Sequence, residues 1–113
     1  MAIVNAQLTT TQLDILTVPT DKSWAITNII VCNNGSTPAS FDMHFVSQSS
    51  SLSNSVTRVI NNLELPVGET FTFDSERIVI NTGDKLSFVS EPDLGGGSAG
   101  KTSLSVTVSY LEV

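Results

Sequence analysis

The chain has 113 residues, a formal net charge of −6 at pH 7 and only 14% charged residues. This length corresponds to one domain with a hydrophobic core of its own. The five Lys and Arg residues provide no basic patch, which excludes nucleic acid and an anionic membrane surface as expected partners.

The sequence also indicates where the protein is made. Cys32 is the only cysteine, so no disulfide can form within the chain and nothing points to an oxidising compartment. The N-terminal residues lack the basic and apolar regions of a signal peptide, and no apolar run approaches the roughly 18 residues of a membrane span. We therefore expect a soluble protein that is synthesised in a cytoplasm and contacts no membrane.

The first residues differ from the rest of the chain. Residues 1–12 contain Ile3, Val4 and Leu8 among Asn, Gln and a run of Thr residues. They are predicted to be either an edge strand or an arm that lies on a neighbouring molecule. Residues 13–113 are predicted to form the folded domain.

Within that domain, short segments rich in β-branched and aromatic residues are separated by turn residues. These segments are 13–18, 24–32, 41–46, 56–65, 70–74, 78–80, 86–90 and 104–110. Apolar and polar residues alternate most clearly in 41–46 and 104–110, which is typical of strands with one buried face. The very apolar segment 24–32 is predicted to be a central strand covered on both sides.

The stretch from 66 to 86 gives the most detailed prediction. Pro66 and Gly68 fit a tight turn, and Phe71 and Phe73 then alternate with Thr residues. An Asn-Thr-Gly-Asp turn at 81–84 separates the two strands that follow. The order of turn, strand, strand, turn and strand predicts a β-meander.

Amphipathic strands must cover one another's apolar faces. About eight of them, separated by frequent turn signals, predict an all-β fold, a single antiparallel β-sandwich. Jelly-roll wiring is the preferred arrangement, and an immunoglobulin-like Greek key is the alternative.

A glycine-rich segment at 95–102, GGGSAGKT, matches the pattern of a phosphate-binding loop. That loop works because a helix begins at its lysine and directs its amides at the phosphates. The residues after Lys101 instead alternate with a period of two and are β-branched. We therefore interpret the segment as a flexible loop and expect no nucleotide cofactor.

Other residues that could carry chemistry are few. His44 is the only histidine and lies two residues from Asp42, an arrangement interpreted as a surface pair rather than an acid–base site. Cys32, within an apolar strand, is predicted to be buried and unreactive. The spacing of His, Cys and carboxylates fits neither zinc nor calcium. The sequence therefore predicts no enzyme, no metal and no cofactor.

The aromatic residues allow two interpretations. Most of them lie in strand patterns among aliphatic residues and are predicted to fill the core: Trp24, Phe41, Phe45, Phe71, Phe73 and Phe88. Tyr110 is the exception. The alternative is a carbohydrate-binding or receptor-binding module, which requires Trp24 or Tyr110 to be exposed beside a polar groove.

A rigid module without chemistry acts through contacts with copies of itself or with another protein. Ile3, Val4 and Leu8 are the predicted anchors of the arm at 1–12. Leu52 and Leu94 are the apolar side chains of the two long polar loops, at 47–55 and 91–101. These five residues are the candidate partner contacts.

Several phrases of the sequence resemble a known group of proteins. They are LTVPTDK at 16–22, ITNIIVCNN at 26–34, LPVGET at 65–70, VINTGDKL at 79–86 and SVTVSY at 105–110. Similar turn and strand phrases occur in small tailed-bacteriophage virion proteins. This sequence departs from their pattern at Thr20 and Asp21, where Ala-Gly is preferred, which alters only the chemistry of that turn.

The resemblance implies a structural part of a phage particle. The expected function is that of a capsid decoration (cement) protein, bound to the outside of the capsid and added in many copies. Its expected partners are the major capsid protein and copies of itself, and its expected location is the surface of the virion. A tail- or fibre-associated module is the alternative.

Overall fold

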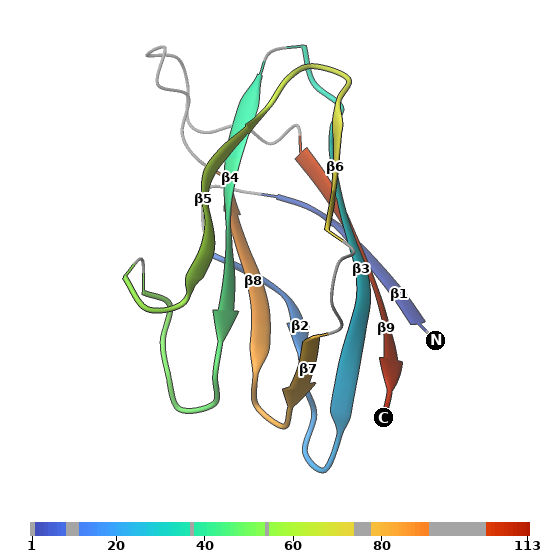
Figure 1. Cartoon of the computed structure of the whole chain (residues 1–113), viewed down its shortest axis with the longest axis vertical. Coiled ribbons are helices and arrows are strands. Elements are labelled where there is room, and N and C mark those ends of the chain that lie inside the picture. Colours follow the sequence, from blue (N-terminus) through green and yellow to red (C-terminus); the bar gives the residue numbers. More distant parts are fainter. Residues whose placement is uncertain (1, 9–11, 37, 54, 74–77, 91–103) are drawn as a thin grey trace.

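Figure 1 shows a computed structural model of the chain, which describes residues 2–8, 12–36, 38–53, 55–73, 78–90 and 104–113. The described residues form nine strands and no helix. The strands are β1 (Ala2–Gln7), β2 (Leu13–Thr17), β3 (Ser23–Asn33), β4 (Ala39–Val46), β5 (Arg58–Leu65), β6 (Thr70–Phe73), β7 (Ile78–Asn81), β8 (Lys85–Ser90) and β9 (Leu104–Glu112).

The strands form two antiparallel sheets that face each other (Figure 1). One is a five-stranded sheet in the order β1-β9-β3, with β6 and β7 both paired to the far side of β3. The other is a four-stranded sheet in the order β2-β8-β4-β5. The prediction of an all-β antiparallel sandwich is therefore confirmed.

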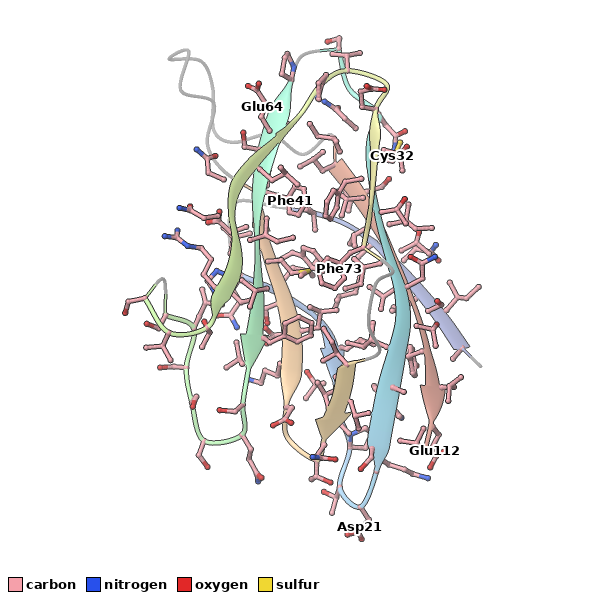
Figure 2. All side chains as sticks on the ribbon, in the orientation of Figure 1. Asp21, Cys32, Phe41, Glu64, Phe73 and Glu112 are labelled. Carbon is pink, nitrogen blue, oxygen red and sulfur yellow. The ribbon has the colours of Figure 1, made fainter. Side chains whose placement is uncertain are left out.

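Alternation along each strand places one set of side chains between the sheets. In the five-stranded sheet, Val4, Val108, Ile29 and Phe73 are cross-strand neighbours and form one apolar row across the inner face. The opposing sheet contributes Phe41, Met43 and Phe88, which have no exposed surface. Figure 2 shows Phe41 and Phe73 pointing into the space between the layers.

The ring of Phe41 links the two sheets. Its centroid lies 6.0 Å from that of Phe71 in the opposite sheet and 6.1 Å from that of Phe88 in its own sheet. Both pairs are tilted, and each such pair adds about 0.5–1.5 kcal/mol beyond the burial of area. Strand 41–46 therefore lies at the centre of the core.

The predicted β-meander is wrong in its pairing, although its strands exist. β6 and β7 do not pair with each other, because both pair with β3, and β8 belongs to the opposite sheet. The turn at 81–84 thus carries the chain from one layer to the other. A local pattern of turns and strands specifies where the chain reverses but not which neighbour it then meets.

That crossing turn is held by the Asp84 carboxylate. Its Oδ2 accepts a hydrogen bond from the backbone N–H of Asn81, and its Oδ1 accepts one from the backbone N–H of Gln48. Gly83 adopts φ of +85°, a left-handed conformation that favours glycine. Backbone hydrogen bonds also join Gly83 and Asp84 to Val18, so the turn ties three segments together at one end of the sandwich.

Replacing Gly83 by Ala is expected to destabilise the fold more than the same change at Gly68. Both glycines have positive φ, but a Cβ at Gly83 would lie 2.7 Å from Cγ of Gln48, whereas a Cβ at Gly68 would meet nothing within 4 Å. We expect about 1 kcal/mol for Gly68→Ala and about 2 kcal/mol for Gly83→Ala. Urea unfolding of both variants provides the comparison, and equal losses would contradict it.

Candidate functional site

Three cross-strand rows lie on the outer face of the five-stranded sheet. None of their described residues has a charged side chain. The register defines these rows: Ile3, Ser109 and Asn28; then Asn5, Thr107, Ile30 and Thr72; then Gln7, Ser105, Cys32 and Thr70. We call this surface the neutral face. A hydrogen bond of 3.0 Å from Asn5 Nδ2 to Thr107 Oγ1 confirms that neighbours within a row contact each other.

Several hydroxyl and amide groups on the neutral face bond to one another or to residues at its margin. The hydroxyl oxygens of Thr27 and Ser109 lie 2.7 Å apart, and Asn34 Nδ2 donates to Ser105 Oγ over 2.9 Å. Asn28 Oδ1, in contrast, is buried and has no hydrogen-bond partner among the described residues. The bonded side chains are pre-ordered, which reduces the entropy lost when a partner binds.

Two predictions for strand 24–32 are wrong because this face is open. Its residues alternate between buried and half-buried, so the strand is central in its sheet but covered only on its inner side. Cys32 is half-buried on the neutral face (Figure 2), and its Sγ lies 3.5 Å from Asn34 Oδ1. An uninterrupted apolar run thus does not require two covered faces.

The outer face of the four-stranded sheet is different because it carries charge. One cross-strand row there contains Asp14, Ser87, His44 and Arg58. Ser87 donates a hydrogen bond of 2.6 Å to Asp14, and Lys85 lies 3.8 Å from the same carboxylate. The two outer faces of the sandwich therefore differ in electrostatic character.

The interpretation of Asp42 and His44 as a surface pair is wrong. Asp42 is 3% exposed and His44 is 0% exposed, because residues of β5 contact Asp42 and Thr57, just before β5, contacts His44. Asp42 accepts a hydrogen bond from the backbone N–H of Asn62 over 2.6 Å and lies 3.6 Å from the Arg58 guanidinium. Each of its oxygens therefore has a partner.

His44 is held in place by Thr57. The Thr57 hydroxyl lies 2.8 Å from His44 Nδ1 and also bonds to the backbone of Ser53, accepting from its N–H and reaching its carbonyl. The other ring nitrogen, Nε2, is buried and has no hydrogen-bond partner among the described residues.

This environment favours the neutral imidazole. Burial lowers the pKa of His44 below its ordinary value of 6.5, the Asp42 carboxylate opposes that shift, and the Arg58 guanidinium adds to it. The Asp42 and His44 side chains are both closed to solvent in this structure. The cluster is a structural element of this sheet.

Acidification is expected to destabilise the protein through His44. Below pH 6.5, His44 binds a proton more readily in the unfolded chain than in the folded chain. The free energy of unfolding is therefore greatest above that pH and falls as the pH decreases. The loss is at most about 1.4 kcal/mol per pH unit. Urea unfolding measured from about pH 7.5 to about pH 5.5 gives this slope. This pH interval lies above the range in which carboxylates titrate.

His44→Asn is the control for this slope. Asn keeps a donor for Thr57 but cannot be protonated, and the chain contains no other histidine. The variant is expected to be less stable overall and to show a flatter pH dependence. An unchanged slope would assign the acid sensitivity to other groups.

A third feature is a surface hollow of about 290 Å³ at one end of the sandwich. It is lined by Ala2, Trp24, Tyr110, Leu111 and Glu112, from the ends of β1, β3 and β9. The ring centroids of Trp24 and Tyr110 lie 4.4 Å apart with an interplanar angle of 35°. Both rings are half-buried and pack against the hydrophobic core, so Trp24 lies at the edge of the core rather than inside it.

The predicted partner contacts are dispersed in the structure. Ile3 is 66% exposed on the neutral face, whereas Val4 is half-buried and packs against the core. Leu8 is 0% exposed and belongs to the core, so its role as a surface anchor is corrected. Leu52 is half-buried in the segment between β4 and β5. Leu94 lies outside the described residues, as does the glycine-rich segment 95–102.

Sequence reasoning missed the polar members of these sites. Glu112, which lines the hollow, and Lys22 lie 90 residues apart in the sequence and form an ion pair of 2.8 Å. The hollow could have been predicted only from the pairing of Trp24 with Glu112 and of Ile26 with Tyr110. These pairings are known only once the strand register is known. The contacts of Arg58 and Asn62 with Asp42 could not be predicted either, because two irregularities in the β4–β5 pairing determine the positions of these residues.

Within residues 2–8, 12–36, 38–53, 55–73, 78–90 and 104–113, no three His, Cys, Asp or Glu side chains are grouped so that they could hold a metal ion. In the same residues there is no helix with the length and hydropathy of a membrane span.

The protein is thus an antiparallel β-sandwich with one neutral outer face, one charged outer face and an aromatic hollow at one end. Its sequence matches no protein-family model and no curated protein. The candidate sites must therefore be judged from their own chemistry.

Proposed function

We propose that this protein is a structural component of a bacteriophage virion, a decoration (cement) protein that binds the outer surface of the capsid. Its partners in this proposal are the major capsid protein and copies of itself. It has no catalytic role, and it requires no cofactor. The likeness of its turn and strand phrases to small virion proteins supports this choice.

The observation that carries the proposal is the neutral face. Charged residues are depleted at the centres of protein interfaces, because a charge that loses its water there must find a partner. Three rows of hydroxyl, amide and apolar side chains satisfy this condition, and Ile3 provides an exposed apolar contact. The charged outer face of the other sheet is the less suitable docking surface.

The strand pairing supports jelly-roll wiring as part of the same proposal. β1 pairs with β9, β2 with β8, β3 with β6 and β7, and β4 with β5. These pairs are nested, as in one long hairpin that has been rolled into two layers. An eight-stranded jelly roll has this nesting if β6 and β7 are counted as one interrupted strand.

In the proposed mechanism, copies bridge neighbouring capsid subunits and oppose the outward pressure of packaged DNA. A stable contact of this kind buries on the order of 1,000 Å² or more. The net charge of −6 is consistent with this role because it disfavours accidental binding to DNA.

The first experiment is mass spectrometry of purified virions that have been separated into heads and tails. The proposal expects the protein in the head fraction in many copies. Its presence only in tails would replace the decoration role with the tail- or fibre-associated one. Its absence from both fractions would overturn the virion proposal.

Charge variants then test the docking face. Ile3→Lys and Thr72→Lys each place a charge at an exposed position of the neutral face, and Val59→Lys does the same on β5 of the other sheet. Sedimentation with capsids that lack the protein is expected to show at least a tenfold weaker attachment for the first two variants only. If Val59→Lys alone weakened attachment, the opposite sheet would be the docking surface.

A further inference from the structure

Trp24 and Tyr110, which line the hollow, carry hydrogen-bonding groups that the fold does not use. Neither the indole N–H of Trp24 nor the hydroxyl of Tyr110 has a hydrogen-bond partner among the described residues, and neither atom is buried. The Ala2 and Leu111 side chains add apolar surface beside the rings. The hollow therefore combines aromatic surface with two free donors.

The charge beside the hollow is balanced. The Glu112 carboxylate and the Lys22 ammonium group lie 2.8 Å apart, and both remain accessible to solvent. Trp24, Tyr110 and the Glu112 carboxylate would by themselves favour a cationic ligand. Here the Lys22 ammonium group would repel such a ligand. An anion would likewise meet Glu112. The balanced pair favours a ligand that is polar and uncharged.

Size restricts the ligand further. A volume of about 290 Å³ lies at the lower limit of small-molecule sites. It accommodates one six-membered sugar ring rather than a nucleotide or a drug-sized molecule. A sugar ring also has an apolar C–H face and a rim of hydroxyl groups, which matches aromatic surface next to donors and a carboxylate acceptor.

We propose that this hollow binds a single neutral hexopyranose unit of a glycan. The C–H face of the sugar lies against the aromatic surface of Trp24 and Tyr110. Its hydroxyl groups accept from the indole N–H and the Tyr110 hydroxyl, and donate to the Glu112 carboxylate. The hollow is separate from the three rows of the neutral face, so this binding does not depend on attachment to a capsid.

Intrinsic fluorescence tests the proposal directly, because Trp24 is the only tryptophan of the chain. Titration with D-glucose, D-galactose and maltotriose is expected to change the emission saturably with at least one of them. About a dozen non-hydrogen atoms in one hexose correspond to a dissociation constant on the order of millimolar. Sorbitol, an open-chain polyol, and choline are the control titrants and are expected to produce no saturable change.

Two matched variants assign the binding to the hollow. Glu112→Gln removes the charged acceptor and is expected to weaken sugar binding about fivefold to tenfold. Glu64→Gln makes the same change at an exposed position at the other end of the molecule and is expected to leave binding unchanged (Figure 2). Thermal unfolding curves verify that both variants are folded.

Several outcomes would overturn the inference. They are the absence of a saturable change with the three sugars and with a glycan array, a saturable response to choline or sorbitol, and equal effects of the two Gln substitutions. Sugar binding by a protein that is absent from virions would support the hollow while refuting the decoration role. The two proposals are therefore separable.

Discussion

Leu8→Ala is expected to lower the free energy of unfolding by about 2–5 kcal/mol, the range found for leucines in well-packed cores. Leu8 is 0% exposed, and its backbone N–H donates to the carbonyl of Leu104 over 2.9 Å. The residue therefore fixes the end of β1 in the core. Equilibrium unfolding in urea measures the loss.

Ile3→Ala provides the matched control within the same segment. Ile3 is 66% exposed, so its truncation is expected to change stability by less than about 0.5 kcal/mol. A similar loss for the two variants would contradict the burial of Leu8.

This contrast has a practical consequence, since deletion of residues 1–9 would remove a strand and a core residue together. Loss of capsid attachment after that deletion would then reflect unfolding, so substitutions at Ile3 are the informative ones.

Asp42→Ala is expected to lower the free energy of unfolding by about 2–4 kcal/mol, because it leaves a guanidinium and a backbone N–H without their buried acceptor. The affected groups are Arg58, whose side chain is 22% exposed, and the N–H of Asn62. Asn62 also has φ of +51°, a conformation that needs support from its surroundings. Urea unfolding again provides the measurement.

The control for Asp42 is Glu64→Ala, which removes an exposed carboxylate from the adjacent strand. Its effect is expected to stay within about 0.5 kcal/mol. A double variant, Asp42→Ala with Arg58→Met, is expected to recover part of the loss because no unpaired cation remains. A loss below about 1 kcal/mol for Asp42→Ala would show that the buried cluster contributes little.

The amino-acid sequence predicts the strands of this protein well because a half-buried strand has a local period of two. Residues 104–110 alternate so regularly that β9 was predictable almost to its ends. The pairing of β6 and β7 with β3 was not predictable in this way. It depends on contacts between residues far apart in the chain, which no turn signal encodes.

Predictions for the sites fail where burial comes from outside the strand. The alternation in 41–46 correctly separates Phe41 and Met43 from Asp42 and His44, but it does not reveal that β5 and the residues before it cover the polar side. Trp24 is only half-buried for the opposite reason, since it lies beside the hollow at the end of the sandwich. Local patterns thus assign residues to a face, and tertiary structure decides how much of that face water reaches.

The position of β9 also affects when the five-stranded sheet can form. It comes after the other eight strands in the sequence, yet in the sheet it lies between β1 and β3. While a ribosome is still producing the chain, β1 and β3 have no shared neighbour, and their backbone groups are open to other nascent chains. Completion of the sheet must therefore follow synthesis of β9, which makes its pairing with β1 and β3 a late step in the folding of this domain.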